Sequence, residues 1–172
     1  MAEDLKKIIR QEYLKCAQDP AHFMKKYCFI QHPQRGRIQF NLYPFQEKTL
    51  HLVRDNPYSI ILKSRQLGIS TLSAGYSLWL MLFHKDKNVL CIATAGRSEA
   101  VSLLLIDEAA FIDNIGEIWA SAQQTLATGG GAIVLSTPYG TGNWFHKTWV
   151  NAEANENQFI PIKLPWFVHP ER

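Results

Sequence analysis

Four short and almost purely apolar runs constrain the fold of this chain more than any other feature. Runs of this length that are apolar throughout are typical of strands buried on both faces of a parallel sheet. Segments with helical character, at 71–84 and 115–125, alternate with them. The sequence therefore predicts an α/β fold, a mainly parallel sheet with helices on both faces. The four predicted strands cover residues 59–63, 88–94, 103–107 and 132–136.

The chain before the first strand has a helical pattern instead. At 4–16, apolar residues recur on one face of a helix, and Asp19-Pro20 is a helix start signal for a second helix over 20–27. We therefore expect a helical N-terminal segment over residues 1–40 and a core domain over 41–168. The other expected elements are a loop at 31–37, a helix at 42–54, a turn at 129–131, a helix at 144–154 and a strand at 159–164.

Composition and charge narrow the class of protein. The chain has 172 residues, 47% hydrophobic and 19% charged, which suits a single domain with a real core and excludes a disordered or coiled-coil protein. Its longest apolar run, 72–83, is shorter than the roughly 20 residues of a membrane-spanning helix. Residues 1–40 hold eight Lys and Arg against four Asp and Glu. An ordinary solvated helix surface explains this excess better than contact with nucleic acid. The three cysteines lack metal-ligand spacing and are expected to be buried or free thiols.

One connection is too short for the predicted sheet. About eight residues join the strand ending at Thr94 to the strand starting at Leu103, whereas a parallel crossover needs about a dozen or more. Either the sheet is unusual here or a segment is absent. We still expect the strand at 103–107 to pair in parallel beside the strand at 59–63 or the strand at 132–136. Apolar surface is then expected to be exposed around Val89, Cys91 and Ala93.

The segment KSRQLGIST, at 63–71, lies between a predicted buried strand and a predicted helix, where backbone N–H groups can cradle phosphate. In the phosphate-loop pattern G-x-x-x-x-G-K-[ST], Ser64 replaces the first glycine and Ile69 replaces the lysine. Lys63 could supply the missing charge, and Arg65 a second one. A plain strand-to-helix turn is the alternative. The predicted phosphate-binding set is Lys63, Ser64, Arg65, Gln66, Leu67, Gly68, Ile69, Ser70 and Thr71.

The segment LLLIDEAAF, at 103–111, places two carboxylates at the C-terminal end of a predicted strand. Ligands bind at this end of the strands in open α/β sheets. Asp107 is expected to hold Mg²⁺ together with the Ser70 hydroxyl, and Glu108 to polarise the attacking water. The alternative is a strand that simply ends in a polar turn. The strand–loop–helix unit about 40 residues upstream disfavours that alternative.

Two further motifs are weak evidence for nucleotide binding when each is taken alone. Ser136 and Thr137 lie at the end of another predicted strand, where small hydroxyls can sense a γ-phosphate. Tyr43, Phe45 and Gln46 lie upstream of the first strand. An aromatic ring there can stack on adenine and the Gln amide can bind the edge of the base, although Tyr43 and Phe45 are equally plausible as core residues.

In this order, LYPFQ, KSRQLGIST, LLLIDEAAFID and LSTPYGTGNWF resemble the large terminase subunit of tailed bacteriophages, the ATPase that packs DNA. The resemblance covers most of residues 20–168. It implies a P-loop NTPase-like core that binds ATP and Mg²⁺. One variant of the terminase phosphate loop carries its lysine at the first position, which supports Lys63 as the phosphate ligand.

The chain departs from the terminase pattern in two places. Family members usually carry several dozen more residues between IAT and GRSEAVS, so a segment near 95–97 is inferred to be absent. Residues 169–172 are interpreted as the start of a linker to a nuclease domain that this chain lacks, and no DNA cleavage is expected. Arg97 resembles an arginine finger, with a surface arginine as the alternative. Whether Arg65 or Arg97 acts as the finger stays open.

The resemblance also implies partners and a place of action. The expected partners are double-stranded DNA, the portal protein of the procapsid, a small terminase subunit and further copies in a ring, usually of five, with no membrane. The expected location is the host cell cytoplasm. Two alternatives remain beside the packaging motor. One is a helicase-like nucleic-acid translocase, which shares the Asp-Glu pair, and the other is a non-hydrolysing remnant of the same fold.

Overall fold

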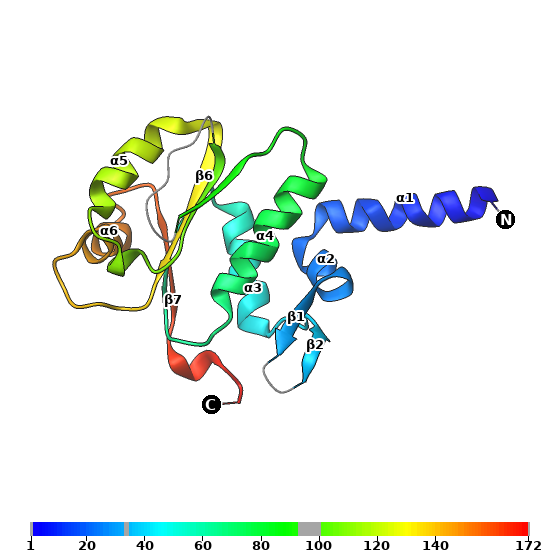
Figure 1. The fold of residues 1–172 in the computed structure, drawn as a ribbon, viewed down its shortest axis with the longest axis horizontal. Coiled ribbons are helices and arrows are strands. Elements are labelled where there is room, and N and C mark those ends of the chain that lie inside the picture. Colours follow the sequence, from blue (N-terminus) through cyan, green and yellow to red (C-terminus); the bar gives the residue numbers. More distant parts are fainter. Residues whose placement is uncertain (1, 33–34, 93–100, 172) are drawn as a thin grey trace.

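The computed structural model describes residues 2–32, 35–92 and 101–171 (Figure 1). Its centre is a five-stranded sheet in the order β4-β5-β6-β3-β7. All four neighbouring pairs in this sheet are parallel, as predicted. The strands are β3 (Tyr58–Lys63), β4 (Val89–Ile92), β5 (Val101–Ile106), β6 (Leu126–Ser136) and β7 (Ile160–Leu164).

Helices cover both faces of the sheet, which confirms the predicted layers (Figure 1). Side chains alternate along each strand, so Ile61 and Leu135 pack toward α3 (Pro44–Asp55) and α4 (Ile69–Phe83). Their neighbours Ile60 and Val134 pack on the opposite face, toward α5 (Ile115–Thr125) and α6 (Trp144–Glu153). The sheet is therefore the middle layer of three.

The N-terminal segment is helical only up to Tyr27. Helices α1 (Ala2–Gln18) and α2 (Pro20–Tyr27) are followed by an antiparallel hairpin of β1 (Phe29–His32) and β2 (Gly36–Gln39), so the loop predicted at 31–37 is wrong. Ile30 pairs with Ile38 and packs against the core. The Gln39 amide ties the hairpin to α2 by donating to the Lys25 carbonyl at 2.7 Å. The packing of Ile30 on the core and this side-chain hydrogen bond outweigh the loop-forming composition of residues 31–37.

Helix α1 extends away from the rest of the chain (Figure 1). Of its predicted apolar face only Cys16 is buried, whereas Leu5, Ile8 and Ile9 are about 60% exposed. The C-terminal end of α1 is held to α2 through Glu12, whose carboxylate accepts hydrogen bonds from three side chains of α2. We call Glu12 and these three donors the Glu12 cluster. The donors are His22 Nε2 at 2.8 Å, Lys26 Nζ at 2.8 Å and the Tyr27 hydroxyl at 3.1 Å.

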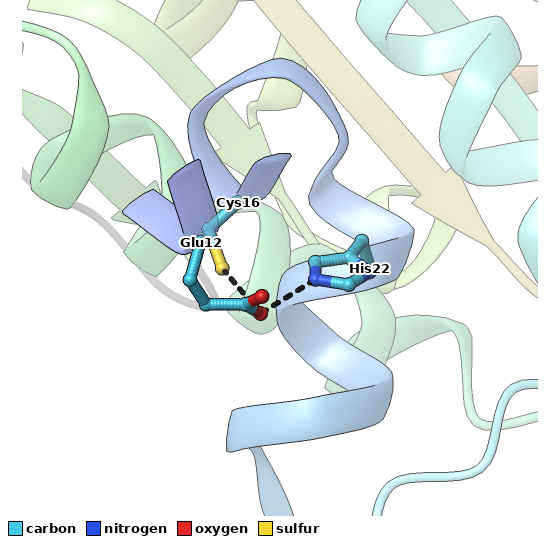
Figure 2. Close-up of side chains that lie close together, drawn as sticks. All are labelled: Glu12, Cys16 and His22. Atoms are coloured by element: carbon cyan, nitrogen blue, oxygen red, sulfur yellow. Dashed lines mark hydrogen bonds and ion pairs between the residues drawn. The ribbon is translucent and has the colours of Figure 1, made fainter. Parts of the chain in front are cut away.

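Figure 2 shows Glu12, Cys16 and His22 of this contact region. The Cys16 thiol lies 4.0 Å from the Glu12 carboxylate, and His22 reaches the same oxygen from α2. Hydrogen bonds from Lys26 and His22 lower the pKa of Glu12 to about 2. Glu12 is therefore an anion at every ordinary pH.

The turn predicted at 129–131 is also wrong, because these glycines lie inside β6. A Cβ added to Gly131 would stand 2.2 Å from the Pro57 carbonyl oxygen, so only glycine lets β6 pass this close to the start of β3. A short 3₁₀ turn (Ala109–Phe111) follows β5 and was not predicted. Helix α4 begins at Ile69, two residues before the predicted start.

The strand β4 lies at one edge of the sheet, beside β5. Strand β5 pairs in parallel with β6, which confirms that the strand at 103–107 lies beside the strand at 132–136. Cys91 is exposed and Val89 is half-buried. Ala93 and the inferred deletion near 95–97 lie outside the described residues. Cys16, Cys28 and Cys91 are free thiols. Within the described ranges, no helix combines the length and apolarity needed to cross a membrane.

Candidate functional site

Three strands bring the predicted site residues to one edge of the sheet. Lys63 ends β3, Asp107 and Glu108 directly follow β5, and Ser136 ends β6. Because these strands are parallel neighbours, their carboxyl ends meet at the same edge. These side chains, which lie up to some 75 positions apart in the sequence, therefore come together at this edge of the sheet.

Lys63 is the centre of this convergence. Its side chain is only 7% exposed, and its ammonium lies 2.6 Å from Glu108 Oε1 and 3.8 Å from Asp107 Oδ1. A buried ammonium is stable only beside an anion. The two carboxylates after β5 therefore keep a cation at the base of the predicted phosphate loop.

Glu108 is held from its other side by the end of β6. Its Oε2 accepts hydrogen bonds from the backbone N–H and the hydroxyl of Thr137, both at 3.1 Å. The Ser136 hydroxyl lies 3.5 Å from the same oxygen and accepts a hydrogen bond from the Ala110 N–H at 3.1 Å. We call Lys63, Glu108, Ser136 and Thr137 the Glu108 cluster. Every hydrogen bond to Glu108 fixes the direction of its carboxylate.

The backbone conformation and the pKa of Glu108 both depart from the ordinary values for a glutamate. Glu108 has a φ of 53°, in the left-handed region that non-glycine residues rarely adopt. Partial burial acts to raise its pKa, but the hydrogen bonds from Lys63 and Thr137 outweigh burial and hold the pKa below its ordinary value. Glu108 is thus an oriented anion on a strained turn, and such strain is concentrated at functional sites.

The loop after β3 turns tightly into α4. Its first N–H, from Ser64, donates to the Leu164 carbonyl at 3.0 Å and so remains attached to the sheet. Gln66 and Gly68 both have positive φ, 59° and 69°. Leu67 and Ile69 are buried, whereas Arg65, Ser70 and Thr71 are exposed. The buried apolar side chains therefore anchor the loop to the core. Its polar side chains and the N-terminus of α4 face the solvent.

The buried side chain of Gln46 ties this loop to the start of α3 by hydrogen bonds. It is 4% exposed. Its Nε2 donates to the Leu67 carbonyl at 2.9 Å, and its Oε1 accepts from the Tyr43 N–H at 3.0 Å. A Cβ on Gly68 would lie 2.8 Å from Gln46 Nε2 and would displace that amide, and the positive φ of this position independently favours glycine.

A cavity of about 490 Å³ lies beside the loop, and we call it the Tyr43 cavity. Tyr43 and Phe45 stack with ring centroids 5.9 Å apart. Burial, and next the nearby Glu171 carboxylate, raise the pKa of Tyr43. Predicted residues that line this cavity are Tyr43, Gln46, Gln66, Leu67, Gly68 and Thr71.

The structure thus brings most of the predicted site residues into two groups, the Glu108 cluster and the Tyr43 cavity. Arg97 lies outside the described residues. Sequence analysis missed Arg35, His169 and Glu171, which also line the cavity. They come from the hairpin and from the chain after the last strand. No local motif marks them, because only the fold brings these segments to the loop.

The available oxygen donors suit the predicted Mg²⁺. Ser70 offers an exposed hydroxyl in the first turn of α4. Asp107 offers a carboxylate that is 29% exposed, with Oδ1 also accepting from the Glu108 N–H at 2.9 Å. Carboxylate and hydroxyl oxygens are the hard ligands that Mg²⁺ takes in proteins. The chemistry of this donor set therefore fits the ion.

Comparison with known proteins agrees with the fold. No protein-family profile matches this sequence. The crystal structure of the HK97 bacteriophage large terminase is similar, with a TM-score of 0.63 at 11% sequence identity. The match covers 87% of this chain and 43% of the HK97 protein, so this chain spans less than half the length of that terminase. The chain therefore has a terminase-like α/β fold.

Proposed function

We propose that this chain is the ATP-hydrolysing motor domain of a viral DNA-packaging terminase. The observation that carries the proposal is the contact of the buried Lys63 with Glu108, at 2.6 Å, beside the strand-to-helix loop that precedes α4. A cation for phosphate and an anion for water are thereby adjacent at the edge of the sheet where ligands bind in this class of fold.

In this proposal each residue has a separate task. The loop backbone, the N-terminus of α4, Lys63 and Arg65 bind the phosphates of ATP. Once phosphate competes for Lys63, the Glu108 carboxylate is released to orient and polarise a water molecule for in-line attack. Thr137 keeps that carboxylate aimed, since it bonds Oε2 rather than the Oε1 that Lys63 occupies.

Mg²⁺ would be held by Ser70 and Asp107, and when bound it would neutralise charge on the phosphates. Asp107 is suited to this task because it is the more weakly engaged of the two carboxylates. Its oxygen lies 3.8 Å from Lys63, against 2.6 Å for Glu108.

The connection of Thr137 to the loop that follows it would couple hydrolysis to movement. A change at Glu108 reaches Thr137 through two hydrogen bonds and then residues 138–142, which are exposed. We propose that this movement translocates double-stranded DNA. The work would be done in the host cell cytoplasm, in a ring of copies on the portal protein of a procapsid, with DNA delivered by a small terminase subunit.

The test is ATP hydrolysis by the purified chain, measured with Mg²⁺ in the presence and absence of duplex DNA. Glu108→Gln serves as the blank. Turnover above that blank, stimulated by DNA, is the expected result. Equal phosphate release from the chain and its blank would refute hydrolysis at this site.

A non-hydrolysing nucleotide-binding remnant is the second candidate. The observation that favours it is that Glu108 is bonded at both oxygens, to Lys63 and to Thr137. ATP binding without turnover in the same preparation would decide for this candidate.

A further inference from the structure

The Tyr43 cavity has the size and the walls of a small-molecule site. Its volume of about 490 Å³ lies within the roughly 300–1,000 Å³ of ligand pockets. It shares Gln66, Gly68 and Thr71 with the predicted phosphate loop, so a ligand bound there is continuous with that loop. Apolar side chains of the hairpin, Ile30 and Ile38, close another side.

Gln46, the residue that sequence analysis expects to bind the base, is already engaged. Its oxygen accepts from Tyr43 and its nitrogen donates to Leu67, and the side chain is 4% exposed. At most one of its N–H groups remains for a ligand. Its position fits a residue that holds the loop rather than one that selects the ligand.

His169 supplies a wall that the sequence motifs do not contain. Its ring centroid lies 4.6 Å from that of Tyr43 and 6.1 Å from that of Phe45. The ring is oriented by its own segment, because Nδ1 accepts from the Glu171 N–H at 3.2 Å. The segment after β7 therefore brings a third ring to the Tyr43–Phe45 stack at the cavity.

We infer that His169 binds the nucleobase of the bound nucleotide by stacking, so that a nucleotide binds more tightly than a bare phosphate chain. The inference rests on the proposed function, because it takes the segment at 63–71 as the phosphate site. A flat heteroaromatic base gains from contact with aromatic rings such as Tyr43 and His169, whereas a bare phosphate chain gains nothing. The ligand class of the cavity is thus a flat nucleobase.

The test compares ATP with inorganic tripolyphosphate, which has the phosphates but neither base nor ribose. Equilibrium titrations are made on the full chain, on His169→Ala and on Phe167→Ala. Phe167 is the matched control, an aromatic residue of the same segment that is 66% exposed. We expect His169→Ala to weaken ATP about tenfold, which corresponds to a stacking contribution of about 1.4 kcal/mol. Tripolyphosphate affinity should not change, and Phe167→Ala should change neither.

A second variant separates stacking from a purely structural role. His169→Phe keeps a flat ring and should keep ATP affinity within about twofold. Equal weakening of ATP and tripolyphosphate by His169→Ala would overturn the inference, as would tripolyphosphate binding as tightly as ATP to the unmodified chain. If neither ligand binds the unmodified chain, the phosphate site itself is wrong and the proposed function falls with it.

Discussion

Two glutamates of this chain have similar surroundings and different positions in the fold. Glu12 accepts hydrogen bonds from a lysine, a histidine and a tyrosine hydroxyl. Glu108 accepts them from a lysine and from the backbone and hydroxyl of a threonine. In both cases these bonds lower the pKa of the carboxyl group. The chemistry of the carboxylate alone does not tell which of them works in a reaction.

The positions of the two residues do distinguish them. Glu12 lies in a regular helix, its partners in α2 are 10 to 15 positions away, and its lysine partner is 51% exposed. Glu108 lies on a left-handed turn at the end of a buried strand, and its lysine partner is 45 positions away and 7% exposed. Strain, distance in sequence and a buried cation together indicate a site whose geometry the whole fold maintains.

The largest difference between the two should appear in turnover. Glu108→Gln keeps the size of the side chain but removes the charge that is proposed to orient water, so ATP hydrolysis should fall by about 100-fold or more while ATP binding remains. Glu12→Gln should leave turnover within about twofold. Steady-state phosphate release and equilibrium binding of ATP measure the two effects. Parent-rate hydrolysis by Glu108→Gln would remove the distinction drawn between the two carboxylates.

The lysine partners should differ next, in nucleotide affinity. Lys63→Ala removes the buried cation at the base of the proposed phosphate loop and should weaken ATP binding about tenfold or more. Lys26→Ala removes the exposed partner of Glu12 and should leave ATP affinity unchanged. Titration with a fluorescent ATP analogue compares the variants. If both lose affinity equally, Lys63 is not a phosphate ligand.

Sequence patterns predicted the sheet well because burial on both faces leaves an unmistakable apolar run. Strands β3 and β5 are found within two residues of their predicted ends, and Lys63, Asp107 and Glu108 lie at their carboxyl ends. The pattern also indicated where these residues meet, since parallel strands share an edge. The convergence of Lys63 with Glu108 could therefore be anticipated.

Other features depended on contacts between distant segments and left no local trace. The hairpin at 29–39 forms because Ile30 and Ile38 pair and Gln39 bonds to α2, against a composition typical of a loop. The sequence predicts a turn at Gly131, but this glycine lies in a strand, where the nearby Pro57 carbonyl leaves no room for a side chain. The place of His169 beside Tyr43 results from the path of the chain after β7. Such tertiary contacts override local propensity.

A smaller difference should appear between the hydroxyl donors of the two clusters. Thr137→Val removes the hydroxyl that bonds Glu108 and keeps the backbone N–H and nearly the same shape. The lost bond is worth about 1 kcal/mol, so turnover should fall about fivefold. Tyr27→Phe, which removes the corresponding hydroxyl at Glu12, should leave turnover unchanged. Identical rates for Thr137→Val and the parent would show that the backbone N–H of Thr137 alone orients Glu108.

The smallest effect concerns the stability of the N-terminal segment in acid. The pKa of Glu12 is lowered from 4.5 to about 2 in the folded chain, first by the hydrogen bond from Lys26 and then by that from His22. A lowered pKa stabilises the fold fully above the unfolded value, and this contribution is lost as pH falls from about 4.5 toward 2. Urea unfolding at several pH values in this window should show a flatter decline for Glu12→Gln than for the parent. Because Glu108 and Asp19 also have lowered pKa values, the parent minus variant difference is the quantity that isolates Glu12. Parallel pH dependences of the unfolding free energy for the parent and Glu12→Gln would contradict this prediction. They would mean that Glu12 binds protons equally in the folded and unfolded states. The Glu12 cluster would then either survive in the unfolded chain or contribute nothing to holding α1 against α2.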